Sequence, residues 1–187
     1  MTANRLSPPR CSCMQNRQCG FSLIELMVTI GVLAIMLLIA IPAFSDFITS
    51  NRLTAQVNEL LGDLRMARNE AASRSRSVRV CIAASSTSCA TSGSDWAAGR
   101  IIWADTNGNA ALDANEIIKY VPALEGSVTF VASGPANTYT LSFVPQGNLA
   151  VASAWTFTLC APGSTTGREL ALPISGRPAA KKITTCS

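Results

Sequence analysis

The sequence predicts an α+β protein in which one long N-terminal helix packs on an antiparallel β-sheet domain. Residues 21–41 are apolar apart from one charge, and a helical pattern of apolar residues continues from them to about residue 77. From residue 78 on, short runs with a period of two are separated by turn signals. Consecutive strands without intervening helices favour an antiparallel sheet, and 187 residues suit one such domain.

Residues 1–20 read as a leader that is removed. This segment has no acidic residue and carries three arginines, Arg5, Arg10 and Arg17. Positive charge before an apolar span keeps that end in the cytosol, so the C-terminal domain is expected in the periplasm, beyond the inner membrane. The leader also holds Cys11, Cys13 and Cys19, whose spacing fits no zinc site.

The run from Phe21 to Ile41 is long enough to cross a membrane. Its 21 residues extend roughly 30 Å as a helix, which matches a bilayer core. Glu25 is its one charge. A carboxylate at membrane depth costs about 2.5 kcal/mol or more near the centre, so it normally has a partner. Since no cation lies nearby in sequence, we expect that partner on another chain.

The residues Gly20-Phe21-Ser22-Leu23-Ile24-Glu25 before this helix resemble the class III signal of type IV pilins and type II secretion pseudopilins. The resemblance implies that prepilin peptidase cuts after Gly20 and that Phe21 is then N-methylated. It also implies that Glu25 contacts the N-terminal amine of a neighbouring subunit. Two alternatives are an ordinary signal anchor and a conventional secretory cleavage, for which Ala40-Ile41-Pro42-Ala43 is a poor site.

Residues 42–77 are expected to continue the helix in amphipathic form. Pro42 removes one backbone hydrogen bond, so a kink or a local weakness is expected there. Residues spaced by three and four form an apolar stripe, namely Phe44, Phe47, Ile48, Val57, Leu60, Leu61, Leu64, Ala67 and Ala71. The opposite, polar face holds Arg52, Asn58, Glu59, Asp63, Arg65, Arg68 and Glu70. The helix should end within the serine-rich segment 73–77.

Residues 78–187 are expected to form the periplasmic β-sheet domain, ending in a basic C-terminal loop. The predicted strands are 78–82, 101–104, 117–121, 128–131, 139–144, 155–160 and 170–174. Turn signals separate them, among them Thr106-Asn107-Gly108, Gly134-Pro135, Pro145-Gln146-Gly147-Asn148 and Pro162-Gly163.

This domain resembles the FimT/GspH-type minor pilins. The resemblance rests on Val78-Arg79-Val80-Cys81 with a second cysteine at Cys89, Ser94-Asp95-Trp96-Ala97-Ala98-Gly99, an Asp-x-Asn-x-Asn loop from Asp105, Phe157-Thr158-Leu159-Cys160, and Ser175-Gly176-Arg177. It implies a minor pilin or pseudopilin that partners other pilins, at a filament or its tip. The motifs leave open whether the filament is a type IV pilus or a type II secretion pseudopilus.

Four cysteines follow the leader, Cys81, Cys89, Cys160 and Cys186. An even number in a periplasmic domain indicates disulfides, and four cysteines allow three pairings. Proximity in sequence favours Cys81–Cys89 and Cys160–Cys186. The alternative is free buried thiols.

The acidic loop 105–116 is a candidate calcium site. Five residues fall at positions 1, 3, 5, 9 and 12 of an EF-hand loop, namely Asp105, Asn107, Asn109, Asp113 and Glu116. However, the glycine stands at position 4 instead of 6, and no helices are expected on either side. A turn rich in Asp and Asn between two strands is the interpretation we prefer.

The sequence favours a structural role over an enzymatic one. It has no histidine, no nucleophile–base pair and no phosphate-binding loop, so we expect neither catalysis nor a cofactor. Without the leader, 12 basic and 11 acidic residues remain, and the tail is the basic end.

The basic tail keeps a second interpretation open. FimT-type proteins of some bacteria bind double-stranded DNA through a Gly-Arg-x-Arg element in a C-terminal loop. Gly176-Arg177 matches this element, but Ala179 stands at its second arginine. Lys181 and Lys182 follow and could supply phosphate contacts with Arg177, although without the bidentate geometry of arginine. The alternative is a solvated basic end that keeps the domain soluble.

Overall fold

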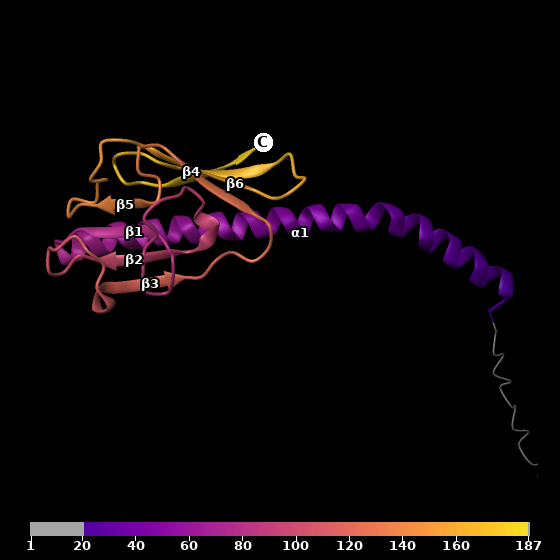
Figure 1. The fold of residues 1–187 in the computed structure, drawn as a ribbon. Helices are drawn as coiled ribbons and strands as arrows, with labels where there is room; N and C mark the ends of the chain where they lie inside the picture. Colours follow the sequence, from indigo (N-terminus) through magenta and orange to yellow (C-terminus); the bar gives the residue numbers. More distant parts are fainter. Residues whose placement is uncertain (1–20, 187) are drawn as a thin grey trace, which may run out of the picture. The chain divides into compact units, whose positions relative to one another are not determined.

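The structure is a computed structural model and describes residues 21–186. The chain divides after Phe44 into two units, of which the second begins at Ser45. The described residues contain the helix α1 (Leu23–Arg74), the short 3-10 helices η1 (Trp96–Ala98) and η2 (Ala114–Glu116), and eight strands (Figure 1). The strands are β1 (Val78–Ile82), β2 (Arg100–Ala104), β3 (Ile117–Val121), β4 (Thr129–Ser133), β5 (Thr140–Phe143), β6 (Trp155–Cys160), β7 (Gly167–Leu172) and β8 (Ala179–Ile183).

The helix α1 begins and ends where the sequence predicts. Its first turn is capped by the Ser22 hydroxyl, which accepts a hydrogen bond from the Glu25 backbone N–H. The backbone stays helical through Pro42. The helix ends at Arg74, inside the serine-rich segment, and Ser75 follows with a φ of 50°.

The second unit contains two antiparallel sheets of four strands each, where we expected a single sheet. The first has the order β3-β2-β1-β5 and the second the order β4-β6-β7-β8. The fold class, a long N-terminal helix followed by antiparallel β-structure, is confirmed. Strand β8 is the last strand of the second sheet and pairs with β7 from Gly167↔Ile183 to Ala171↔Ala179.

The expectation of a basic C-terminal loop is wrong for Lys181 and Lys182, because residues 179–183 form the edge strand β8, whereas Arg177 lies in the turn before this strand. Strand β7 also begins three residues earlier than predicted, at Gly167. Both differences arise from contacts between distant residues, since β7 and β8 pair with each other and β7 pairs with β6.

One hydrophobic core joins α1 to both sheets. The helix contributes a stripe of fully buried residues spaced by three and four, Leu53, Val57, Leu60, Leu64, Ala67 and Ala71. Val80 and Phe143 cover it from the first sheet, and Phe157 and Leu170 from the second. In Figure 1 strands of both sheets lie along this same stretch of α1.

The buried stripe is shorter than the sequence predicts. Phe44, Phe47 and Ile48 continue its spacing toward the N-terminus, but their side chains are more than half exposed. The core covers α1 only from Leu53 onward.

Candidate functional site

The N-terminal turn of α1 places Glu25 at a favourable position for an acidic residue. Its backbone N–H is 3.2 Å from the Ser22 Oγ, so Ser22 acts as the cap and Glu25 lies in the first turn. A carboxylate in the first turn interacts favourably with the helix dipole. Within residues 21–186 no lysine or arginine forms an ion pair with this carboxylate. Glu25 therefore has a local role in its own helix and an acidic oxygen left for another group.

The apolar segment after Glu25 is exposed along its whole length. Among the described residues, α1 is the one helix that by length and composition could cross a membrane, with a mean hydropathy of 2.7 over its most apolar window. Each side chain from residue 21 to residue 41 is exposed among the described residues. So many exposed apolar side chains require an apolar environment that the described residues do not supply.

A buried cluster of charges joins α1 to the first sheet, and the sequence did not indicate it. The helical pattern predicts Asp63 on the polar face of the helix, yet it is only 3% exposed. Its Oδ2 accepts hydrogen bonds from the Arg100 side chain, from Nε at 2.7 Å and also from Nη2. Its Oδ1 accepts one from the Lys119 Nζ at 2.6 Å. Because Arg100 lies on β2 and Lys119 on β3, Asp63 fixes the helix against two strands.

Both disulfides favoured by sequence proximity are present. Cys81 on β1 is bonded to Cys89, and Cys160 at the end of β6 is bonded to Cys186. The second bridge ties the chain after β8 back to β6. It thereby restrains the edge strand, whose residues are otherwise mostly exposed.

The loop 105–116 supplies its own oxygens with hydrogen-bond donors. Asp105 accepts from the backbone N–H groups of Gly108 and Ala110, and Asp113 accepts from the side-chain amides of Asn107 and Asn109. In the described part of the chain, no three His, Cys, Asp or Glu side chains lie together so that they could hold a metal ion. The arrangement is that of a hydrogen-bonded turn between β2 and β3.

Glu116 is the centre of that loop and is only 2% exposed. Its carboxylate accepts hydrogen bonds from the Thr106 hydroxyl, the Thr106 and Asn107 N–H groups and the Asp113 N–H. The Thr106 hydroxyl is the largest cause that lowers the pKa of Glu116, and the three backbone N–H groups act in the same direction. Burial opposes them and does not prevail. The lowered pKa favours the ionised form of Glu116, whose carboxylate holds the turn together through these hydrogen bonds.

The basic residues of the tail do not form one group. Successive residues of a strand point to opposite faces, so Lys181 and Lys182 lie on opposite faces of β8. The Lys181 Nζ is 2.9 Å from the Glu169 carboxylate. Arg177 lies in the turn between β7 and β8 and lines a pocket with Arg65 and Arg68 of α1. The structure thus brings Arg177 to two helical arginines that the sequence did not connect with it.

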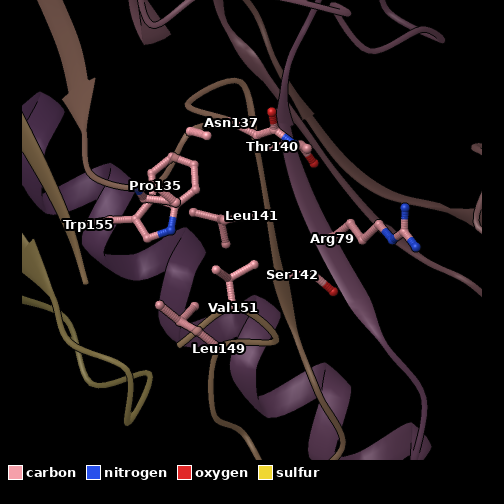
Figure 2. A pocket seen from close by; sticks show the side chains of 10 residues that line it. Arg79, Pro135, Asn137, Thr140, Leu141, Ser142, Leu149, Val151 and Trp155 are labelled. Atoms are coloured by element: carbon pink, nitrogen blue, oxygen red, sulfur yellow. The ribbon is translucent and has the colours of Figure 1, made fainter. Parts of the chain in front are cut away.

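An apolar pocket of about 260 Å³ lies beside β5 (Figure 2). Its apolar wall includes Leu141, Leu149, Val151 and Trp155. Figure 2 shows the Arg79 guanidinium directed away from these side chains, and it lies over the Trp103 ring at 5.2 Å from the ring centroid. The residues that line the pocket include no acid and no cysteine, so the described pocket lacks a nucleophile–base pair.

Comparison with known families matches residues 56–176 to the family described as "Type II transport protein GspH". This segment is more than half of the 187 residues. The chain belongs to the GspH family. Residues 15–41 of this GspH-family chain match the prokaryotic N-terminal methylation motif. The chain is a minor pilin or pseudopilin, as its N-terminal signal and strand motifs predicted, and its family and fold are those of structural pilin subunits.

The GspH-family chain is also similar to a solved minor pilin. It matches the type IV minor pilin FimU of Pseudomonas aeruginosa with a TM-score of 0.55 and 25% sequence identity, over 75% of this chain and 99% of the FimU chain. A second crystal form of FimU gives a TM-score of 0.54 at 23% identity, over 72% and 99% of the two chains, and supports the fold alone.

Two pilins of Moraxella bovis are similar to a short part of the chain. Fimbrial protein Q is 47% identical over 45 residues, or 24% of this chain and 29% of that protein. The type IV major alpha-pilin is 44% identical over 45 residues, or 24% and 28% of the two chains. The chain thus spans less than a third of the length of these curated relatives.

Several expected sites lie outside the described residues. These are the cleavage position after Gly20 and the three leader cysteines. The residues that the sequence interpretation missed are Asp63, Arg100 and Lys119 as one cluster, and Arg65 and Arg68 as neighbours of Arg177. The sequence does contain one indication of the charged cluster. Arg100 adjoins the apolar residues of β2, and a charged residue on a buried strand normally has a buried partner.

Proposed function

We propose that this chain is a filament subunit that is held in the inner membrane by residues 21–41 and then assembled through them. The observation that carries the proposal is the exposed apolar segment of α1 with Glu25 as its one charge. Inside a filament the corresponding segments of other pilins would cover these apolar side chains. The second unit, with its own core and disulfides, is the part that remains in the periplasm or on the filament surface.

Processing of the N-terminus belongs to this proposal. Prepilin peptidase cleaves between Gly20 and Phe21, and the new amine of Phe21 is methylated. Gly20→Val should leave the leader attached, because a branched side chain does not fit a site built for glycine. Mass spectrometry of the protein from its own membrane tests this step. An intact leader on the wild-type chain, or an N-terminus at Ala43 or later, would contradict it.

Glu25 serves assembly in this proposal. Its carboxylate pairs with the N-terminal amine of a neighbouring subunit within the apolar filament interior, where an unpaired charge is costly. Membrane insertion does not need Glu25, since removing a charge from an apolar span makes insertion easier.

The machine served by the subunit is either a type IV pilus or a type II secretion pseudopilus. A deletion strain separates the two. Loss of surface pili or twitching motility with normal exoprotein secretion would assign the chain to a pilus. Retained pili with exoproteins trapped in the periplasm would assign it to type II secretion.

A second candidate function is a receptor for double-stranded DNA on the filament. It is favoured by the exposed Arg177 and Lys182, for which residues 21–186 offer no ion-pair partner. Lys181 contributes less, because Glu169 neutralises it. Binding should be weak, independent of sequence and steeply dependent on salt, with a slope of about −0.9 per phosphate neutralised. A gel-shift titration of residues 48–187 with duplex DNA tests it, and absence of salt-sensitive binding at low ionic strength would exclude the receptor role.

A further inference from the structure

We propose that the pocket between α1 and the β7–β8 turn is a binding site for a phosphate group. The pocket has a volume of about 390 Å³, within the range of small-ligand sites. It is lined by Arg65, Arg68 and Asn69 from α1 and by Gly176, Arg177 and Pro178 from the turn. This inference deepens the second candidate function, because Arg177 belongs to both, and it does not depend on filament assembly.

The charge of the pocket is uncompensated. None of its lining residues is acidic. Within residues 21–186 the Arg65 and Arg177 side chains make no hydrogen bond and no ion pair. In contrast, four other cations form ion pairs with acidic side chains, namely Arg74, Arg100, Lys119 and Lys181. Three guanidinium groups around one hollow repel one another unless an anion lies between them.

The fold places the three arginines beside the pocket. Positions 65, 68 and 69 are three and four residues apart, so they share one face of the helix. The Arg68 Nε donates a hydrogen bond to the Gly147 carbonyl oxygen at 2.9 Å. The turn carrying Arg177 closes on that same carbonyl at Gly176, which is buried and has a φ of 71°. A Cβ on Gly176 would lie 2.2 Å from the Gly147 oxygen. Only glycine permits this approach, which brings Arg177 toward Arg68.

The chemistry of the pocket fits a phosphate better than a carboxylate. A planar guanidinium group donates paired hydrogen bonds to neighbouring oxygens, and phosphate offers such pairs in several directions. One carboxylate can accept a pair of hydrogen bonds from one guanidinium group and carries one charge, whereas three arginines line this pocket. A phosphate ester or pyrophosphate, with more oxygens and up to twice the charge per group, can satisfy more than one of them. The phosphate could come from a small ester or from a nucleic-acid backbone, and both present the same oxygens.

Equilibrium dialysis of the full chain in maltoside micelles tests the site at low ionic strength. The probes are labelled inorganic pyrophosphate and a labelled 12-base-pair duplex. Wild-type protein should bind at least one of them, and Arg65→Gln and Arg177→Gln should each weaken that binding by about tenfold or more. The matched control is Arg76→Gln, which alters another exposed arginine that does not line the pocket. Thermal unfolding should be nearly unchanged in all three variants.

Which of the two probes binds shows where the phosphate group comes from. Binding of pyrophosphate, with or without the duplex, indicates a site for small phosphate esters. Binding of the duplex alone indicates a phosphodiester backbone, and both outcomes support a phosphate site. The proposal is overturned if wild-type protein binds neither probe, or if Arg76→Gln weakens binding as much as Arg65→Gln does. A chain that binds pyrophosphate but never enters filaments would refute the assembly proposal and leave this one intact.

Discussion

Replacing Asp63 should be among the most damaging single changes in the second unit. Asp63→Leu removes the carboxylate that accepts hydrogen bonds from both Arg100 and Lys119. The Arg100 side chain is 1% exposed, and among the described residues its one remaining ion-pair partner would be Glu59, whose carboxylate is 3.6 Å away and 44% exposed. Removing one member of a buried ion pair, so that the other charge stays buried without its partner, costs about 3–5 kcal/mol. Glu59 offsets part of this, so we expect about 3 kcal/mol, a large fraction of a typical domain's stability.

The pair Asp63→Leu and Arg100→Met shows whether the cost comes from the unpaired charge. Each single substitution should lower the free energy of unfolding by several kcal/mol. The double substitution should cost much less than their sum, because apolar residues of similar volume can replace a buried ion pair with little loss. Glu59→Ala is the control on the same helix and should cost about 1 kcal/mol or less.

Urea denaturation of residues 45–187 with both disulfides intact measures these differences. The denaturation midpoint should fall in Asp63→Leu while the m-value stays unchanged. The reasoning fails if Asp63→Leu costs no more than Glu59→Ala. It also fails if the double substitution costs the sum of the single ones, since the charges would then not be coupled.

Three further predictions follow from the same contacts. Gly176→Ala should lower the free energy of unfolding by about 1–3 kcal/mol, because it adds backbone strain and a clash with the Gly147 oxygen. Gly163 has a similar φ of 72° but open space around it, so Gly163→Ala should cost less. Thermal melts of the two variants measure the difference. The loop-closure estimate gives about 3.5 kcal/mol for the Cys160–Cys186 bridge and about 2.5 kcal/mol for the Cys81–Cys89 bridge. The variant with both Cys160 and Cys186 replaced by serine should therefore unfold at a lower urea concentration than the variant with Cys81 and Cys89 replaced, and the reverse order would contradict the estimate. Because the pKa of Glu116 is lowered in the folded state, its stabilising contribution is complete above the ordinary glutamate pKa and is lost as the pH falls through the lower folded value. The stability difference between wild type and Glu116→Gln should therefore shrink from pH 7 to pH 3, and a difference that grows on acidification would refute this.

The elements with strong local patterns could be predicted from the sequence. The alternation of residues 78–82 and 155–160 matches β1 and β6 to the residue, and the stripe from Val57 to Ala71 is the buried face of α1. Strand β8 could not be found this way, because Ala179-Ala180-Lys181-Lys182 has low β-propensity and no alternation. Its conformation is set by pairing with β7 and by the bridge from Cys186 to Cys160.

The charged cluster and the arginine pocket depend on contacts between distant residues. Asp63 has a polar position in the helical pattern, and its partner Arg100 lies 37 residues away. Arg177 is more than 100 residues from Arg65 and meets it only because the β7–β8 turn closes on the loop at Gly147. The exposure of Phe44 and Phe47 also could not be foreseen, since spacing shows which residues share a face and not where the core ends.

The incorporation of Glu25→Ala subunits into filaments tests the central claim most directly. The chain with this substitution should accumulate in the inner membrane at the wild-type level, and its amount in purified filaments, measured by quantitative mass spectrometry, should fall to background. Asp46→Ala is the control, because it removes another acidic residue of α1 that lies beyond the apolar segment. Its incorporation should match the wild type. Incorporation of Glu25→Ala at the wild-type level would contradict pairing between subunits through this carboxylate.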